Sequence, residues 1–123
     1  MDTNAVIEFL SGTLPESGNK WMQLIIENSH HYLSVINQIE LLGYNGTSLE
    51  MQPLEDFVQY SSVLPLSEEV AQMTIQLRKT RKIKLPDAIV APTAIVFDLT
   101  LVTRNIADFE KIEGPTCRNP HLI

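Results

Sequence analysis

This sequence contains a single cysteine, few aromatic residues and no long hydrophobic run. With only Cys117 among 123 residues, an internal disulfide is excluded, and a reducing compartment such as the cytoplasm is indicated. No stretch approaches the roughly 18 consecutive apolar residues of a membrane helix, and the segment after Met1 lacks the basic patch and apolar run of a secretory signal. We therefore expect a soluble cytoplasmic protein without a membrane partner, folded as one domain over residues 1–123.

Basic residues are also scarce. Nine lysines and arginines stand against 15 acids, and the net charge of −6 would on average repel nucleic acid. Residues 1–77 hold ten acids and one base, whereas residues 78–123 hold eight bases and five acids. One short segment holds five of the bases: Arg78, Lys79, Arg81, Lys82 and Lys84. This basic run is either a solvated helix end, where cations suit the helix dipole, or a patch that guides phosphates.

Apolar runs alternate with amphipathic segments in the order typical of an α/β fold, in which a parallel sheet is flanked by helices on both faces. We expect strands over residues 32–36, 62–66, 99–103 and 116–118. We expect a first helix capped by residues 2–4 and running through Leu10, and further helices over 20–28, 37–42, 48–61, from Ser67 into the basic run, and from Pro86 through Val96, with a helical turn at 107–110. Prolines predict an interruption near Pro53 and a kink at Pro92.

Four acids stand where such a fold binds its ligands, at the carboxyl ends of strands or the starts of the following helices. They are Asp2, Glu40, Asp87 and Asp108. Carboxylates within about 5 Å of one another repel by roughly 3 kcal/mol per pair at an effective dielectric near 20, so their approach needs compensation. Mg²⁺ or Mn²⁺ would provide it, because both ions prefer oxygen ligands, and either can activate water against a phosphodiester.

Each of these acids also has an ordinary structural interpretation. Asn37 and Glu40 have the spacing of a capping box, in which Glu40 would bond back to the Asn37 backbone. Asp87 follows a proline in the first turn of a helix, where acids suit the dipole. Asp2 would cap the first helix together with neighbouring Asn4, and Asp108 a local turn. The occurrence of all four at strand ends nevertheless favours a metal site.

Four short segments carry a more specific pattern. They are the opening residues 2–7 (DTNAVI), residues 34–43 around Glu40 (SVINQIELLG), residues 85–91 around Asp87 (LPDAIVA), and residues 101–109, which end in Asp108 and Phe109 (LVTRNIADF). In this order and across nearly the whole chain, they resemble the acidic motifs of PIN-domain ribonucleases. Within that family, the motifs are most similar to those of the VapC-type toxins of toxin–antitoxin pairs.

The resemblance implies a Rossmann-like PIN fold, dependence on Mg²⁺ or Mn²⁺, and endonucleolytic cleavage of RNA. Position by position, it implies Asp2, Glu40 and Asp87 as metal ligands, Asp108 as the fourth acid, and Thr103 and Asn105 in support. Arg104 and the basic run, Arg78, Lys79, Arg81, Lys82 and Lys84, would then hold the RNA backbone. The same resemblance implies a cognate antitoxin and a homodimer.

The sequence also departs from this family in one respect that bears on function. Family members usually have several apolar residues before the first motif, and these form a central strand, whereas only Met1 stands here. We therefore expect that strand to be truncated or absent. The alternative function is a catalytically silent PIN-fold module that binds a protein or RNA without cutting it.

Overall fold

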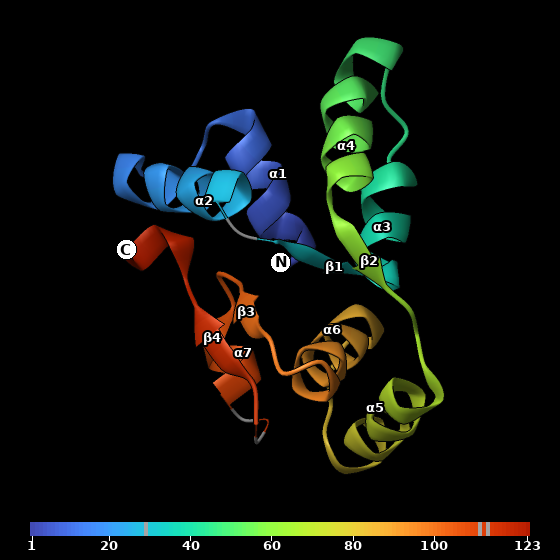
Figure 1. Ribbon diagram of the computed structural model, residues 1–123. Coiled ribbons are helices and arrows are strands. Elements are labelled where there is room, and N and C mark those ends of the chain that lie inside the picture. The colour runs from blue at the N-terminus through green and yellow to red at the C-terminus, as the bar shows by residue number, and fades with distance from the viewer. Residues whose placement is uncertain (29, 111, 113) are drawn as a thin grey trace.

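Helices surround short parallel strands in the computed structural model of the protein, which describes all residues except 29, 111 and 113 (Figure 1). The helices are α1 (Thr3–Ser11), α2 (Glu16–Asn28), α3 (Val35–Leu42), α4 (Ser48–Tyr60), α5 (Glu68–Thr80), α6 (Leu85–Val96) and α7 (Ile106–Glu110). The strands are β1 (Tyr32–Ser34), β2 (Ser62–Leu64), β3 (Thr100–Val102) and β4 (Thr116–Arg118), and a 3₁₀ turn (Pro120–Leu122) follows β4. The predicted α/β class is confirmed. In the part of the chain that is described, no helix is both long and apolar enough to cross a bilayer.

The strands form two separate parallel pairs instead of the single sheet that we expected. β1 pairs with β2, and β3 pairs with β4. The first two residues lie between these pairs (Figure 1): the Met1 ammonium donates to the Tyr32 carbonyl at 2.9 Å, and the Asp2 amide donates to the Val102 carbonyl at 2.8 Å. Residues 1 and 2 thus form a short bridge between the two pairs of strands.

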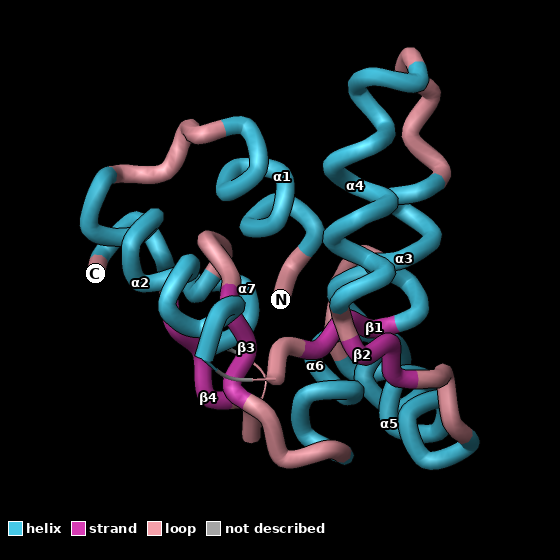
Figure 2. Tube along the Cα trace, turned by 45° about the horizontal axis from the view of Figure 1, so that its top comes forward, coloured by secondary structure: helices cyan, strands magenta, loops and turns pink. Residues whose placement is uncertain are grey.

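Two hydrophobic clusters lie on either side of this bridge. One contains Val6, Leu33, Leu41, Phe57 and Val58, and joins α1, β1, α3 and α4. The other joins α6 to β3 and α7 through Val90, Ala91, Ala94, Leu101 and Phe109. Figure 2 shows α5 beside α6, and α4 beside α3. Because α6 is buried along most of its length, the residue at its start, Asp87, has a fixed place relative to both clusters.

The start of α3 differs from the sequence-based expectation, whereas its end at Leu42, before Gly43, is as predicted. The helix begins at Val35, with Ser34 as its N-cap: the Ser34 hydroxyl accepts from the Ile36 amide at 3.2 Å, and the Asn37 amide oxygen accepts from the Ser34 amide at 2.9 Å. The predictions that the strand runs to Ile36 and that Asn37 is the N-cap were therefore wrong by a few residues. The capping box consists of Ser34 and Asn37, which leaves the Glu40 carboxylate available for another contact.

Prolines interrupt the helices less than we expected. α4 continues through Pro53, so the predicted interruption is wrong. The missing amide of Pro53 leaves the Leu49 carbonyl without its helical donor, but Leu49 is 86% exposed, and water can replace the lost bond. At the start of α4, Thr47 and Glu50 form a capping box that stabilises the helix.

Candidate active site

The four predicted acids come from four different elements, and three of them raise the pKa of the fourth, Asp87. Asp2 precedes α1, Glu40 is on α3, Asp87 is in the first turn of α6, and Asp108 is on α7. Burial raises the pKa of the half-buried Asp87, and the negative charges of Asp2, Asp108 and Glu40 raise it further, against the opposing charge of Lys84. The fold therefore places Asp2, Glu40 and Asp108 within electrostatic reach of Asp87, and we call these four carboxylates the acid cluster.

Asp2 is buried and is held by a neighbour from the other end of the sequence. The Thr103 hydroxyl donates to Asp2 Oδ2 at 3.0 Å, and the same hydroxyl oxygen accepts from the backbone amide of Asn105 at 3.0 Å. The Asp2 side chain makes no capping hydrogen bond to α1, so the interpretation of Asp2 as a side-chain cap is wrong. Burial raises the pKa of Asp2, while the Thr103 hydrogen bond lowers it in part. Thr103 thus orients this acid, as the sequence predicted for it.

Glu40 is held by two residues that the sequence analysis did not select as site residues. The Thr3 hydroxyl donates to Glu40 Oε1 at 2.8 Å, and the buried Asn37 amide donates to the Thr3 hydroxyl oxygen at 3.0 Å. The interpretation of Glu40 as the partner of Asn37 in a capping box is therefore wrong. Because Thr3 directly follows Asp2, its place beside an acid could have been inferred from the first motif, whereas the role of Asn37 needed the correct start of α3.

The chemistry of the acid cluster fits a hard divalent cation. Its donors are carboxylate and hydroxyl oxygens, which Mg²⁺ and Mn²⁺ prefer. Among the described residues, however, no three aspartate, glutamate, histidine or cysteine side chains lie close enough together to hold one ion. Mg²⁺ does not require such a cage, since it usually keeps several waters and binds proteins through one or two carboxylates. The negative charge around Asp87 is the observation that favours a cation here.

The basic run is only partly brought to the acid cluster. Arg78 and Lys79 lie in the last turn of α5, where the ordinary interpretation as a solvated helix end applies. The chain then turns back toward α6, and Lys84, the residue before that helix, is near enough to lower the pKa of Asp87. Arg104 directly follows Thr103, whose hydroxyl donates to Asp2. The remaining predicted RNA-binding residues, Arg81 and Lys82, are exposed in the loop between α5 and α6.

Comparison with known proteins agrees with this arrangement. The sequence matches the family described as PIN domain over residues 1–115. No curated protein matches it. In a toxin–antitoxin complex from Klebsiella pneumoniae, a chain 28% identical superposes with a TM-score of 0.74, over 97% of this chain and 94% of the other.

Two further structures are similar. One is the DNA-bound VapBC from Salmonella typhimurium, with 26% identity, a TM-score of 0.77, and coverage of 97% of this chain and 95% of the other. The second, VapBC2 from Rickettsia felis bound to a promoter DNA fragment, has 23% identity and a TM-score of 0.77 over 96% and 95% of the two chains, and supports the fold alone. With its family match over residues 1–115 and its parallel strands, this chain belongs to the PIN domain family.

Proposed function

We propose that the protein is the toxin of a toxin–antitoxin pair and acts as an endoribonuclease that depends on Mg²⁺ or Mn²⁺. The observation that carries this proposal is the effect of three other carboxylates on Asp87, since such a gathering of like charge is unfavourable unless a cation offsets it. Membership of the PIN domain family supports the nuclease function.

In this proposal the acid cluster, Asp2, Glu40, Asp87 and Asp108, holds the metal ion. When bound, the ion supplies an activated water for attack on a phosphodiester and offsets negative charge in the transition state. Thr103 keeps Asp2 oriented, and Thr3 does the same for Glu40, so that neither carboxylate has to reorganise during the reaction. Asn105 supports this arrangement through its backbone amide, which fixes the Thr103 hydroxyl.

RNA would be held by the cationic side chains near this site. Lys84 acts on Asp87, and Arg104 follows Thr103, which contacts Asp2. Arg78, Lys79, Arg81 and Lys82 would extend the positive surface along the end of α5. Contacts of this kind bind phosphates without regard to sequence and weaken with salt. They would allow a chain of net charge −6 to bind an anionic substrate.

The partner and setting follow from the relatives. The similar structures from Klebsiella pneumoniae and Salmonella typhimurium are toxin–antitoxin complexes, which supports a cognate antitoxin for this chain. We further propose that the protein forms a homodimer, as the family resemblance implies. A single cysteine suits the reducing cytoplasm, where the RNA substrate is present.

Substitution of Asp87 by asparagine tests the nuclease proposal. Asp87→Asn preserves the shape of the side chain but removes a charge, so we expect Mg²⁺-dependent RNA cleavage to fall by at least about 100-fold. Cleavage by the unsubstituted protein should stop in EDTA. Asp98→Asn is the matched control, because Asp98 lies in the turn after α6 and has a positive φ of 53° that asparagine also adopts. Equal cleavage by both variants would remove Asp87 from the mechanism.

The second candidate is a PIN-fold module that binds RNA or protein without cleavage. It is favoured by the finding that, within the described residues, no three candidate ligands lie close enough together to hold one ion. Purified protein without EDTA-sensitive nuclease activity, together with an Asp2→Ala variant whose response to Mg²⁺ is unchanged, would support this module and contradict the nuclease.

A further inference from the structure

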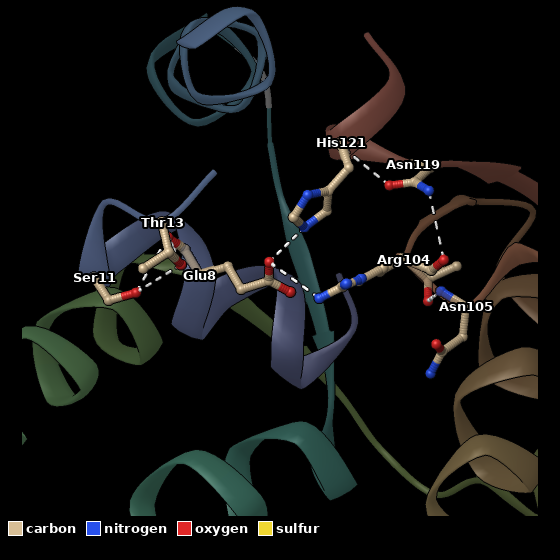
Figure 3. Close-up of polar contacts among 8 residues, drawn as sticks. Glu8, Ser11, Thr13, Arg104, Asn105, Asn119 and His121 are labelled. Atoms are coloured by element: carbon tan, nitrogen blue, oxygen red, sulfur yellow. Dashed lines mark hydrogen bonds and ion pairs between the residues drawn. The ribbon is translucent and has the colours of Figure 1, made fainter. Parts of the chain in front are cut away.

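A second polar cluster joins segments that are far apart in the sequence (Figure 3). One carboxylate oxygen of Glu8 contacts His121 Nε2, and Arg104 Nη1 lies 4.0 Å from the same oxygen. Glu8 is on α1, Arg104 follows β3, and His121 belongs to the 3₁₀ turn. The Glu8 side chain is 17% exposed and that of Arg104 is 64% exposed, so a largely buried anion faces an exposed cation.

Glu8 is close enough to the acid cluster to act on it. Burial is the main cause of the raised pKa of Asp2, and the negative charge of Glu8 raises it further. Arg104 is tied to the same place through the backbone, because the preceding residue, Thr103, donates to Asp2. Attraction to Glu8 therefore draws the Arg104 guanidinium toward α1 instead of leaving it to extend freely into solvent.

The partners of Glu8 are themselves fixed. Asn119 accepts from the His121 amide at 2.9 Å, and its own amide donates to the Arg104 carbonyl at 3.5 Å (Figure 3). The turn that carries His121 also packs against α2, so closely that a Cβ on Gly18 would lie 1.7 Å from the Pro120 carbonyl oxygen. The imidazole is thus held against Glu8 by a packed turn, which orients the carboxylate toward Arg104.

This arrangement has little value for stability but leaves Arg104 able to bind an anion. An ion pair with one exposed partner at 4.0 Å contributes little to folding. A guanidinium carries five N–H donors in a planar fork, and one carboxylate oxygen cannot occupy them all. The same fork matches a phosphate, which accepts two parallel hydrogen bonds.

We propose that Glu8 is a positioning residue: with its carboxylate oriented by His121, it holds the Arg104 guanidinium beside the acid cluster, where Arg104 binds an RNA phosphate that adjoins the bond to be cleaved. The inference rests on the proposed ribonuclease function and extends it to Glu8 and His121, for which no sequence pattern indicated a role.

Binding of RNA tests this role separately from cleavage. In an Asp87→Asn background, a fluorescently labelled single-stranded RNA oligonucleotide is titrated with protein at several salt concentrations, and fluorescence anisotropy gives the affinity. If the only effect of Glu8 were to repel the negatively charged RNA, Glu8→Gln would strengthen RNA binding. We expect the opposite, a loss of about fivefold, as for one exposed charged contact.

A double-variant comparison links this loss to Arg104. Arg104→Ala should also bind RNA about fivefold more weakly and lower the slope of log affinity against log salt by about 0.7, the value for one phosphate contact on a single strand. Glu8→Gln combined with Arg104→Ala should bind no more weakly than Arg104→Ala alone, because both changes remove one interaction. In the cleavage-competent protein, Glu8→Gln should raise KM with little change in kcat.

The controls cover folding and charge. Glu16→Gln removes a matched acid that is paired with Lys20 at 3.1 Å on the surface of α2, and it should not weaken RNA binding. His121→Ala should reproduce the loss seen in Glu8→Gln, and it serves as the test if Glu8→Gln unfolds at a lower temperature. Unchanged or tighter binding by Glu8→Gln, or losses that add in the double variant, would overturn the proposal. Protein that shows the expected binding pattern but cuts no RNA would contradict the nuclease function and support the role of Glu8.

Discussion

The Thr103 hydroxyl is shared by two hydrogen bonds. It donates to Asp2 and accepts from the Asn105 amide, and the Thr103 side chain is fully buried. A buried carboxylate without a donor is costly, and so is a buried amide without an acceptor. The Thr103 hydroxyl therefore stabilises the fold, by satisfying two polar groups, and also orients Asp2 in the candidate active site.

Thr103→Val tests both effects with a side chain of similar shape. Valine leaves Asp2 and the Asn105 amide without their partner, so we expect the free energy of unfolding to fall by about 1–3 kcal/mol and the pKa of Asp2 to rise further, as followed by urea denaturation and by NMR titration. Thr93→Val is the matched control, because the Thr93 hydroxyl only adds a bond to the Ile89 carbonyl of its own helix. Equal losses in the two variants would show that Thr103 has no special role.

The sequence was most informative about residue types and least informative about residue contacts. It indicated Asp2, Thr103 and Asn105, which the fold does bring together. It did not indicate that Thr3 donates to Glu40, 37 positions away, or that Glu8 contacts His121, 113 positions away. Side-chain contacts at such separations follow from the packing of elements, which local patterns do not encode.

At the scale of elements, the choice between adjacent capping residues decided the accuracy of the prediction. Ser34 and Asn37 are both good N-caps, and three positions separate them. Both contribute to the cap of α3, with Ser34 as the N-cap itself. Where a single residue with a clear preference begins a helix, as Ser67 does for α5, the predicted start was confirmed. Competing signals thus displaced an element boundary without changing the type of element.

The contact between α2 and the 3₁₀ turn can be tested by adding one methyl group. In Gly18→Ala, the new Cβ would meet a backbone oxygen of Pro120 that cannot rotate away, so the two elements must separate. We expect a loss of about 1–3 kcal/mol in unfolding free energy, together with weaker RNA binding, because His121 would leave Glu8.

Gly46→Ala is the control for this change. Its Cβ would meet the ring of the exposed Tyr44 at 3.0 Å, and a flexible side chain can move, so the effect should stay within about 0.5 kcal/mol. An unchanged denaturation midpoint for Gly18→Ala would mean that the turn moves without loss and does not fix His121.

At the scale of the whole molecule, the parallel order of strands accounts for part of the arrangement of the acids. Glu40 and Asp108 follow β1 and β3, as expected for residues beyond the carboxyl ends of parallel strands, whereas Asp2 and Asp87 begin helices that no described strand directly precedes. The sequence could not predict that the strands form two pairs joined by Met1 and Asp2, because that depends on how the two flanking pairs are placed in three dimensions. The gathering of charge is a property of the fold and should affect its stability.

Mg²⁺ should therefore stabilise the folded protein, measured as Tm in EDTA and at increasing Mg²⁺ concentration. The folded state carries repulsion around Asp87 that the unfolded chain lacks, and an ion that binds only the folded state adds about 2.7 kcal/mol at 100 times its Kd. Asp87→Asn relieves part of the repulsion, so the Tm of this variant in EDTA should be equal to or above that of the unsubstituted protein. The Tm of the variant should not rise when Mg²⁺ is added. Asp98→Asn should keep the increase. An identical Mg²⁺ effect in Asp87→Asn would place the ion away from the acid cluster, and the raised pKa of Asp87 would then reflect burial together with uncompensated repulsion.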